Sequence, residues 1–104
     1  MIKHVILWKL KEELSDSEKA AVKEKIKCGL EGLEGKIPGL LDITVQICPL
    51  AGSNAEVMLD SSFESEEALK GYAVHPEHVR VADTFVRPYT QVRMCMDYER
   101  KDCD

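Results

Sequence analysis

The sequence predicts an α+β fold in which strands and helices follow one another in the order strand, helix, strand, strand, helix, strand. Three observations predict it: period-two alternation of branched and aromatic residues in four segments, one long amphipathic helix pattern behind a capping box, and a second helical region interrupted by a proline. The 104 residues, of which 44% are hydrophobic, suffice for one core and exclude a second domain. We assign residues 1–99 to this domain and 100–104 to a polar C-terminal tail.

The first predicted strand covers residues 2–10. Its alternation places Ile2, His4, Ile6, Trp8 and Leu10 on one face and Lys3, Val5, Leu7 and Lys9 on the other. Because both faces carry apolar residues in the middle of the strand, we expect both faces of the sheet to be covered.

A helix is predicted from Ser15 to about Gly35. Ser15 and Glu18 have the spacing of a capping box. One apolar stripe then recurs at helical spacing, formed by Val22, Ile26, Leu30, Leu33 and Ile37. Pro38 and Gly39 end this region.

The second half of the chain predicts a hairpin, a broken helix and a last strand. Residues 41–48 and 56–64 alternate as two strands, and residues 65–72 and 76–87 form a helix that is interrupted before Pro76. The last strand, residues 89–98, places on one face Thr90, Val92, Met94, Met96 and Tyr98.

This order is the split β-α-β pattern of ferredoxin-like folds, with a four-stranded antiparallel sheet. Two helices cover only one face of such a sheet, so the second apolar face requires another surface. The simplest supplier is a second copy of the chain, and we therefore predict a homodimer in which two sheets close into a dimeric α/β barrel.

Composition excludes several classes of protein. The 14 Lys and Arg against 19 Asp and Glu give a net charge of -5, which disfavours binding to nucleic acid and to anionic membrane surfaces. The apolar run Val5–Trp8 is too short for a membrane span or a signal peptide, so we expect a cytoplasmic protein. The four cysteines show no C-x-x-C pair, so neither a zinc site nor a disulfide framework is indicated, although a disulfide from Cys103 stays open.

Residues 72–78 hold the side chains best suited to chemistry. This stretch places Tyr72, His75 and His78 around a predicted helix break. A histidine can accept a proton near neutral pH, and a tyrosine hydroxyl can donate a hydrogen bond to a carbonyl or enolate oxygen. The two histidines need not have the same role, because His75 precedes a proline and cannot be helical.

The chain resembles the stress-responsive dimeric A/B barrel (Dabb) family along almost its whole length. The resemblance rests on Ile2-Lys3-His4-Val5, on the hairpin region Thr44–Phe63 with Phe63-Glu64-Ser65 at its end, and above all on Tyr72-x-x-His75-Pro76-x-His78. It implies a ferredoxin-like protomer, a barrel of two protomers, and cellular roles that are mostly uncharacterised.

A more distant similarity is to olivetolic acid cyclase, a plant polyketide cyclase of that family. It implies that His78 is a catalytic base, that Tyr72 orients or polarises the reacting oxygen, and that His4 lies in the pocket. We place in the same candidate pocket His75, Ile6, Trp8, Val22 and Ile26. Positions that are aromatic in the first helix of the cyclase are here Val22, Lys23 and Ile26, so its substrate does not transfer directly.

Three function classes follow. The first is a homodimeric Dabb protein that binds a small hydrophobic or carbonyl-containing molecule, and the second is a cofactor-free cyclase or isomerase that uses His78 and Tyr72. The third is a haem or quinol monooxygenase of the same fold. A purely structural role stays open beside them, with His75 capping a helix, His78 bonded to a backbone carbonyl and Tyr72 packed on the sheet. We expect no cofactor, and no metal, since the two histidines lack an evident third ligand.

Overall fold

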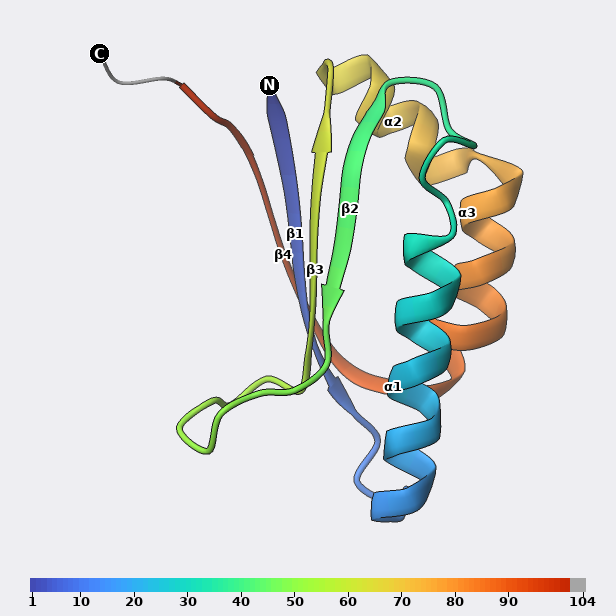
Figure 1. Cartoon of the computed structure of the whole chain (residues 1–104), viewed down its shortest axis with the longest axis vertical. Coiled ribbons are helices and arrows are strands. Elements are labelled where there is room, and N and C mark those ends of the chain that lie inside the picture. Colours follow the sequence, from blue (N-terminus) through green and yellow to red (C-terminus); the bar gives the residue numbers. More distant parts are fainter. Residues whose placement is uncertain (102–104) are drawn as a thin grey trace.

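A computed structural model describes residues 1–101 and shows a layer of helices on one face of a sheet (Figure 1). The elements are β1 (Ile2–Leu10), α1 (Asp16–Glu31), β2 (Leu40–Gln46), β3 (Val57–Phe63), α2 (Glu66–Val74), α3 (Pro76–Val81), the π-helical turn η1 (Ala82–Val86), the 3-10 turn η2 (Arg87–Tyr89) and β4 (Thr90–Glu99). The sheet order is β2-β3-β1-β4, and every neighbouring pair is antiparallel. The predicted ferredoxin-like fold is confirmed, whereas the question of a Cys103 disulfide lies outside the described residues.

Helix α1 begins as predicted and ends earlier. The Glu18 backbone N–H donates to the Ser15 hydroxyl at 3.1 Å, and the Ser15 N–H donates to the Glu18 carboxylate at 3.0 Å. The helix ends at Glu31, with Gly32 as its C-cap, and Gly35 then adopts a φ of 82° that a helix cannot continue through. Ile37 is nevertheless buried, so the apolar stripe predicted which side chains face the sheet and not how far the helix extends.

Strand β2 begins with an irregularity that changes which residues face the core. The register shifts between Leu40 and Asp42, so Leu40 is buried and Leu41 is 45% exposed. Strict alternation predicted Leu41 on the apolar face, and that prediction was wrong because a bulge reverses the direction of a side chain. Beyond the bulge, Ile43 and Val45 are buried as predicted.

The helices leave the opposite face of the sheet uncovered (Figure 1). On that face Val5 of β1 lies opposite Met96 of β4, and Leu7 lies opposite Met94. The exposed apolar side chains of this face, which we call the open face, are Leu7, Val92, Met94, Met96 and Tyr98. The second apolar face expected from the sequence is therefore present on β1 and β4.

No helix within residues 1–101 combines the length and the apolar character needed to cross a membrane.

Candidate functional site

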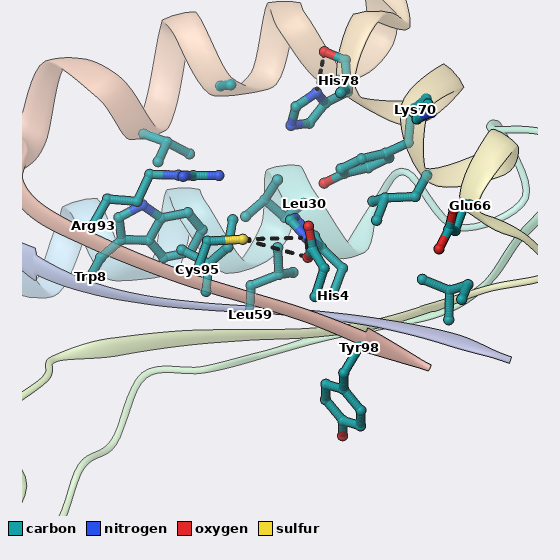
Figure 2. Close-up of a pocket in the computed structure, with 18 of the residues that line it drawn as sticks. His4, Trp8, Leu30, Leu59, Glu66, Lys70, His78, Arg93, Cys95 and Tyr98 are labelled. Atoms are coloured by element: carbon teal, nitrogen blue, oxygen red, sulfur yellow. Dashed lines mark hydrogen bonds and ion pairs between the residues drawn. The ribbon is translucent and has the colours of Figure 1, made fainter. Parts of the chain in front are cut away.

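A cavity of about 740 Å³ lies between the helices and the β1–β4 half of the sheet. It forms because the helices pack mainly on β1, β2 and β3, while β4 lies at the sheet edge with its side chains exposed. Figure 2 shows His4 and Trp8 of β1, Arg93 and Cys95 of β4, and His78 of α3 around this space. Cavities of roughly 300–1,000 Å³ are typical of small-molecule sites.

Tyr72 of α2 is the most buried polar side chain on the cavity wall, at 1% exposure. Its ring packs edge-on against Phe63, with ring centres 5.0 Å apart, and against His4 at 5.9 Å. Its hydroxyl has no hydrogen-bond partner among the described residues. Burial raises the pKa of Tyr72, so the phenol stays protonated and can act as a donor. A molecule in the cavity that carries an acceptor oxygen would satisfy this hydroxyl.

His78 of α3 stacks on Tyr72, with ring centres 4.1 Å apart and planes inclined by 30°. Its Nδ1 lies 3.4 Å from the Ala73 carbonyl oxygen, and only a protonated Nδ1 can donate there. In the neutral ring this contact leaves Nε2 as the free acceptor. Burial lowers the pKa of His78, and the nearby Arg87 and His4 lower it further, against the opposing effect of the Ala73 carbonyl. The ring is therefore uncharged at neutral pH and suited to accept a proton.

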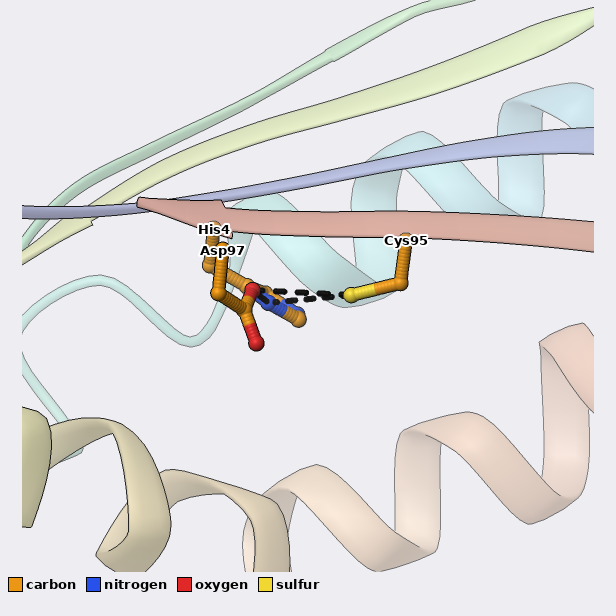
Figure 3. A group of neighbouring side chains, drawn as sticks. All are labelled: His4, Cys95 and Asp97. Atoms are coloured by element: carbon orange, nitrogen blue, oxygen red, sulfur yellow. Dashed lines mark hydrogen bonds and ion pairs between the residues drawn. The ribbon is translucent and has the colours of Figure 1, made fainter. Parts of the chain in front are cut away.

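His4 of β1 is buried and bonded to a carboxylate. Antiparallel pairing places His4 directly opposite Asp97 of β4, and its Nδ1 contacts an Asp97 carboxylate oxygen. Cys95, two residues before Asp97 on the same side of the strand, brings its sulfur to 3.8 Å from the His4 Nδ1. The β1–β4 wall therefore presents an imidazole, a thiol and a carboxylate together (Figure 3).

The structure brings together most of the residues that the sequence singled out. His4, Ile6, Trp8, Tyr72 and His78 all line the cavity. Their proposed roles in binding or catalysis stay predictions.

Three predicted pocket residues lie elsewhere. The Glu77 backbone N–H donates to the His75 Nδ1 at 3.1 Å, so His75 caps α3 and does not line the cavity. Val22 and Ile26 lie in the hydrophobic core on the side of α1 that faces the sheet. Their helical spacing indicates burial and cannot distinguish a core position from a cavity wall.

Sequence reasoning missed the polar residues that β4 contributes. Arg93, Cys95 and Asp97 share the face of β4 that points toward the helices, opposite in direction to the Met94 and Met96 side chains. Their period-two spacing was visible in the sequence. That these side chains adjoin His4 follows only from the pairing of β4 with β1, which joins residues 93 positions apart.

The chain matches the family described as the stress responsive A/B barrel domain, Dabb, over residues 2–100. The chain belongs to the Dabb family. A dimeric protein of unknown function with a ferredoxin-like fold from Bacteroides fragilis is 32% identical, with 95% of each chain covered and a TM-score of 0.89. The family therefore accounts for nearly the whole of the described chain.

More divergent structures share the fold of this Dabb domain. A Dabb family protein from Mesorhizobium loti is 18% identical, with 97% of each chain covered and a TM-score of 0.73. A hydroxynitrile lyase from Passiflora edulis is 13% identical, with coverage of 99% of this chain and 95% of that one and a TM-score of 0.72. No curated protein sequence matches this chain.

Proposed function

We propose that this Dabb protein is a homodimer in which each chain binds a small hydrophobic, carbonyl-containing molecule in the cavity beside Tyr72 and His78. The observation that carries the proposal is that Tyr72 belongs to the cavity wall and that its buried hydroxyl has no partner within residues 1–101. An unsatisfied buried hydroxyl costs about 1–3 kcal/mol, so an acceptor oxygen at this point gains both a hydrogen bond and specificity. A carbonyl supplies such an oxygen.

The remaining wall of the cavity supports the same class of ligand. Ile2, Ile6 and Trp8 form an apolar floor on β1, and each is at most 8% exposed. The polar and charged residues of the lining surround this floor and come mainly from α2 and β4. The apolar floor accommodates the hydrocarbon part of the ligand while Tyr72 holds its oxygen.

The homodimer is supported by the open face. Large apolar side chains that are 37–66% exposed there would be removed from water by a second sheet of the same kind. The similar protein from Bacteroides fragilis is described as dimeric. The cavity is lined by helix residues and by side chains of β1 and β4 that point toward the helices, so a face-to-face pair of sheets would leave it accessible in both chains.

A second candidate function is proton transfer at the carbon next to a carbonyl, as a cyclase or an isomerase requires. The stacked pair favours it, because Nε2 of neutral His78 can take the α-proton while the Tyr72 hydroxyl donates to the enolate oxygen that forms. Return of the proton to another carbon, or attack of the enolate on a second carbonyl, completes the reaction without an added cofactor.

The test uses NMR to follow the uptake of deuterium by heptane-2,4-dione in heavy water. The protein and the dione are present at equal concentrations. We expect exchange above the buffer rate with the wild type and loss of that excess in His78→Ala. The matched control is His75→Asn, which removes a histidine outside the cavity and retains an N-cap side chain. Because the pKa of His78 is lowered, the excess rate should persist below pH 6.5.

Each outcome bears on one candidate. Shifts of Tyr72 and His78 resonances on addition of the dione, without excess exchange, support ligand binding and refute proton transfer. The absence of such shifts for this dione, for a longer alkyl dione and for an aromatic ketone refutes the carbonyl-binding proposal. Saturable haem binding that displaces these ligands would support the monooxygenase class in its place.

A further inference from the structure

The cluster of His4, Cys95 and Asp97 has the composition and geometry of an open zinc site. We propose that this cluster binds one divalent zinc-type cation per chain, with its fourth coordination position directed into the cavity. The three donor atoms, His4 Nδ1, Cys95 Sγ and an Asp97 carboxylate oxygen, all lie within 4.8 Å of one another. Figure 3 shows the three side chains converging from β1 and β4 on the helix-facing side of the sheet.

The distances to sulfur fit a tetrahedral ion. With zinc–sulfur bonds near 2.3 Å and zinc–nitrogen or zinc–oxygen bonds near 2.1 Å, a tetrahedral ion separates the sulfur from either other donor by about 3.6 Å. The observed separations are 3.8 Å from Cys95 Sγ to His4 Nδ1 and 3.5 Å to the Asp97 oxygen. His4 and Asp97 are in direct contact and must separate, which the 45% exposed Asp97 side chain can do by rotation.

The charges also fit. A thiolate and a carboxylate balance the two charges of the cation, and a neutral imidazole is the third ligand that zinc most often takes in such sets. Without a cation, the Cys95 thiol donates to the Asp97 carboxylate at 3.5 Å. A cation replaces that proton and the contact between His4 and Asp97.

A catalytic triad with Cys95 as the nucleophile explains the cluster less well. In a Cys–His–carboxylate triad, the histidine uses one ring nitrogen for the sulfur and the other for the carboxylate. Here Cys95 and Asp97 both approach the same atom, His4 Nδ1. Three donors that converge on one point are the arrangement of a metal site. The three-ligand set leaves one position open to the cavity, as catalytic zinc sites do, where water or an oxygen of a bound molecule can coordinate.

The metal site can be tested separately from the proposed carbonyl ligand, because the metal alone serves as the probe. Tag-free full-length protein is titrated with Zn²⁺ against a chromophoric chelator, and with Co²⁺ by absorption spectroscopy. We expect one equivalent of metal per chain, a thiolate-to-cobalt charge-transfer band, and the intense visible bands of four-coordinate cobalt. Cys95→Ser should abolish the charge-transfer band and weaken Zn²⁺ binding by on the order of 100-fold or more.

The control is the triple variant Cys28→Ser, Cys48→Ser, Cys103→Ser, in which Cys95 is the remaining cysteine. It should bind Zn²⁺ like the wild type, and Asp97→Asn should bind more weakly than the exposed control Asp42→Asn. Melting temperatures verify that each variant is folded. The proposal is overturned if Zn²⁺ binding is not saturable, if Cys95→Ser leaves it unchanged, if the triple variant loses it, or if the cobalt spectrum lacks a thiolate band.

Discussion

Tyr72 and His78 stack because the helix between them is broken. Six positions apart in a continuous α-helix, two side chains point about 120° away from each other. His75 instead adopts an extended backbone, with φ -66° and ψ 132°, because it precedes Pro76, and its side chain then caps the next helix. The break turns α3 so that His78 reaches the ring of Tyr72. A single proline therefore determines the geometry of the candidate catalytic pair.

Tyr72→Phe should raise the free energy of unfolding of the ligand-free protein by about 1 kcal/mol, because it removes a buried hydroxyl that lacks a partner. The same change should abolish the response to carbonyl ligands. Urea unfolding without ligand and NMR titration with the dione measure the two effects. Tyr89→Phe, a change outside the cavity lining, is the matched control and should leave the ligand response intact. A Tyr72→Phe protein that is less stable and still binds would contradict the assignment.

Two glycines allow close contacts that position the helices. Gly39, just before β2, has a φ of 79°, and a Cβ atom there would lie 2.4 Å from the Cβ of Ala68 in α2. Gly29 of α1 similarly allows Val81 of α3 to approach, with an added Cβ only 3.0 Å from its side chain. These contacts fix the positions of α2 and α3, and hence the positions of Tyr72 and His78.

Gly39→Ala should lower the free energy of unfolding by more than Gly35→Ala does. Both positions have positive φ, so each alanine costs about 1 kcal/mol of backbone strain, whereas only position 39 adds a clash with Ala68. We expect a loss of about 2 kcal/mol or more for Gly39→Ala, measured by chemical unfolding. Equal losses for the two variants would show that α2 moves away at no cost.

On the scale of the whole molecule, the two faces of the sheet differ in what covers them. Its helix-facing side carries the core and the cavity, and its open face carries apolar side chains on β1 and β4 that pair across the strands. A bound partner on the open face would stiffen β4, which is an edge strand in the single chain and supplies Arg93, Cys95 and Asp97 to the cavity wall. The proposed dimer and the proposed site would therefore share one strand, β4.

Met96→Lys should convert the proposed dimer to a monomer, because it places a charge in the centre of the apolar open face. Light scattering should return about twice the chain mass for the wild type and a single chain mass for the variant. Val74→Lys replaces an apolar side chain that is 76% exposed on α2 and should leave the mass unchanged. A wild type that is monomeric at micromolar concentration would refute the dimer.

The sequence alone determined the element order, the ferredoxin-like class and the two apolar faces, because period-two and helical spacing report directly which side chains avoid water. It also singled out Tyr72 and His78, because their side chains suit acid–base chemistry. It placed His75, Val22 and Ile26 in the pocket, and the structure places them in a cap and in the core.

Only the tertiary structure decided which residues from distant parts of the chain share the cavity. The pairing of His4 with Asp97, the proximity of Cys95, and the bulge that exposes Leu41 depend on strand register, and register is set by the packing of the whole sheet. Local spacing describes each strand by itself. Which side chains meet across the sheet is determined by the pairing of strands that are far apart in the sequence.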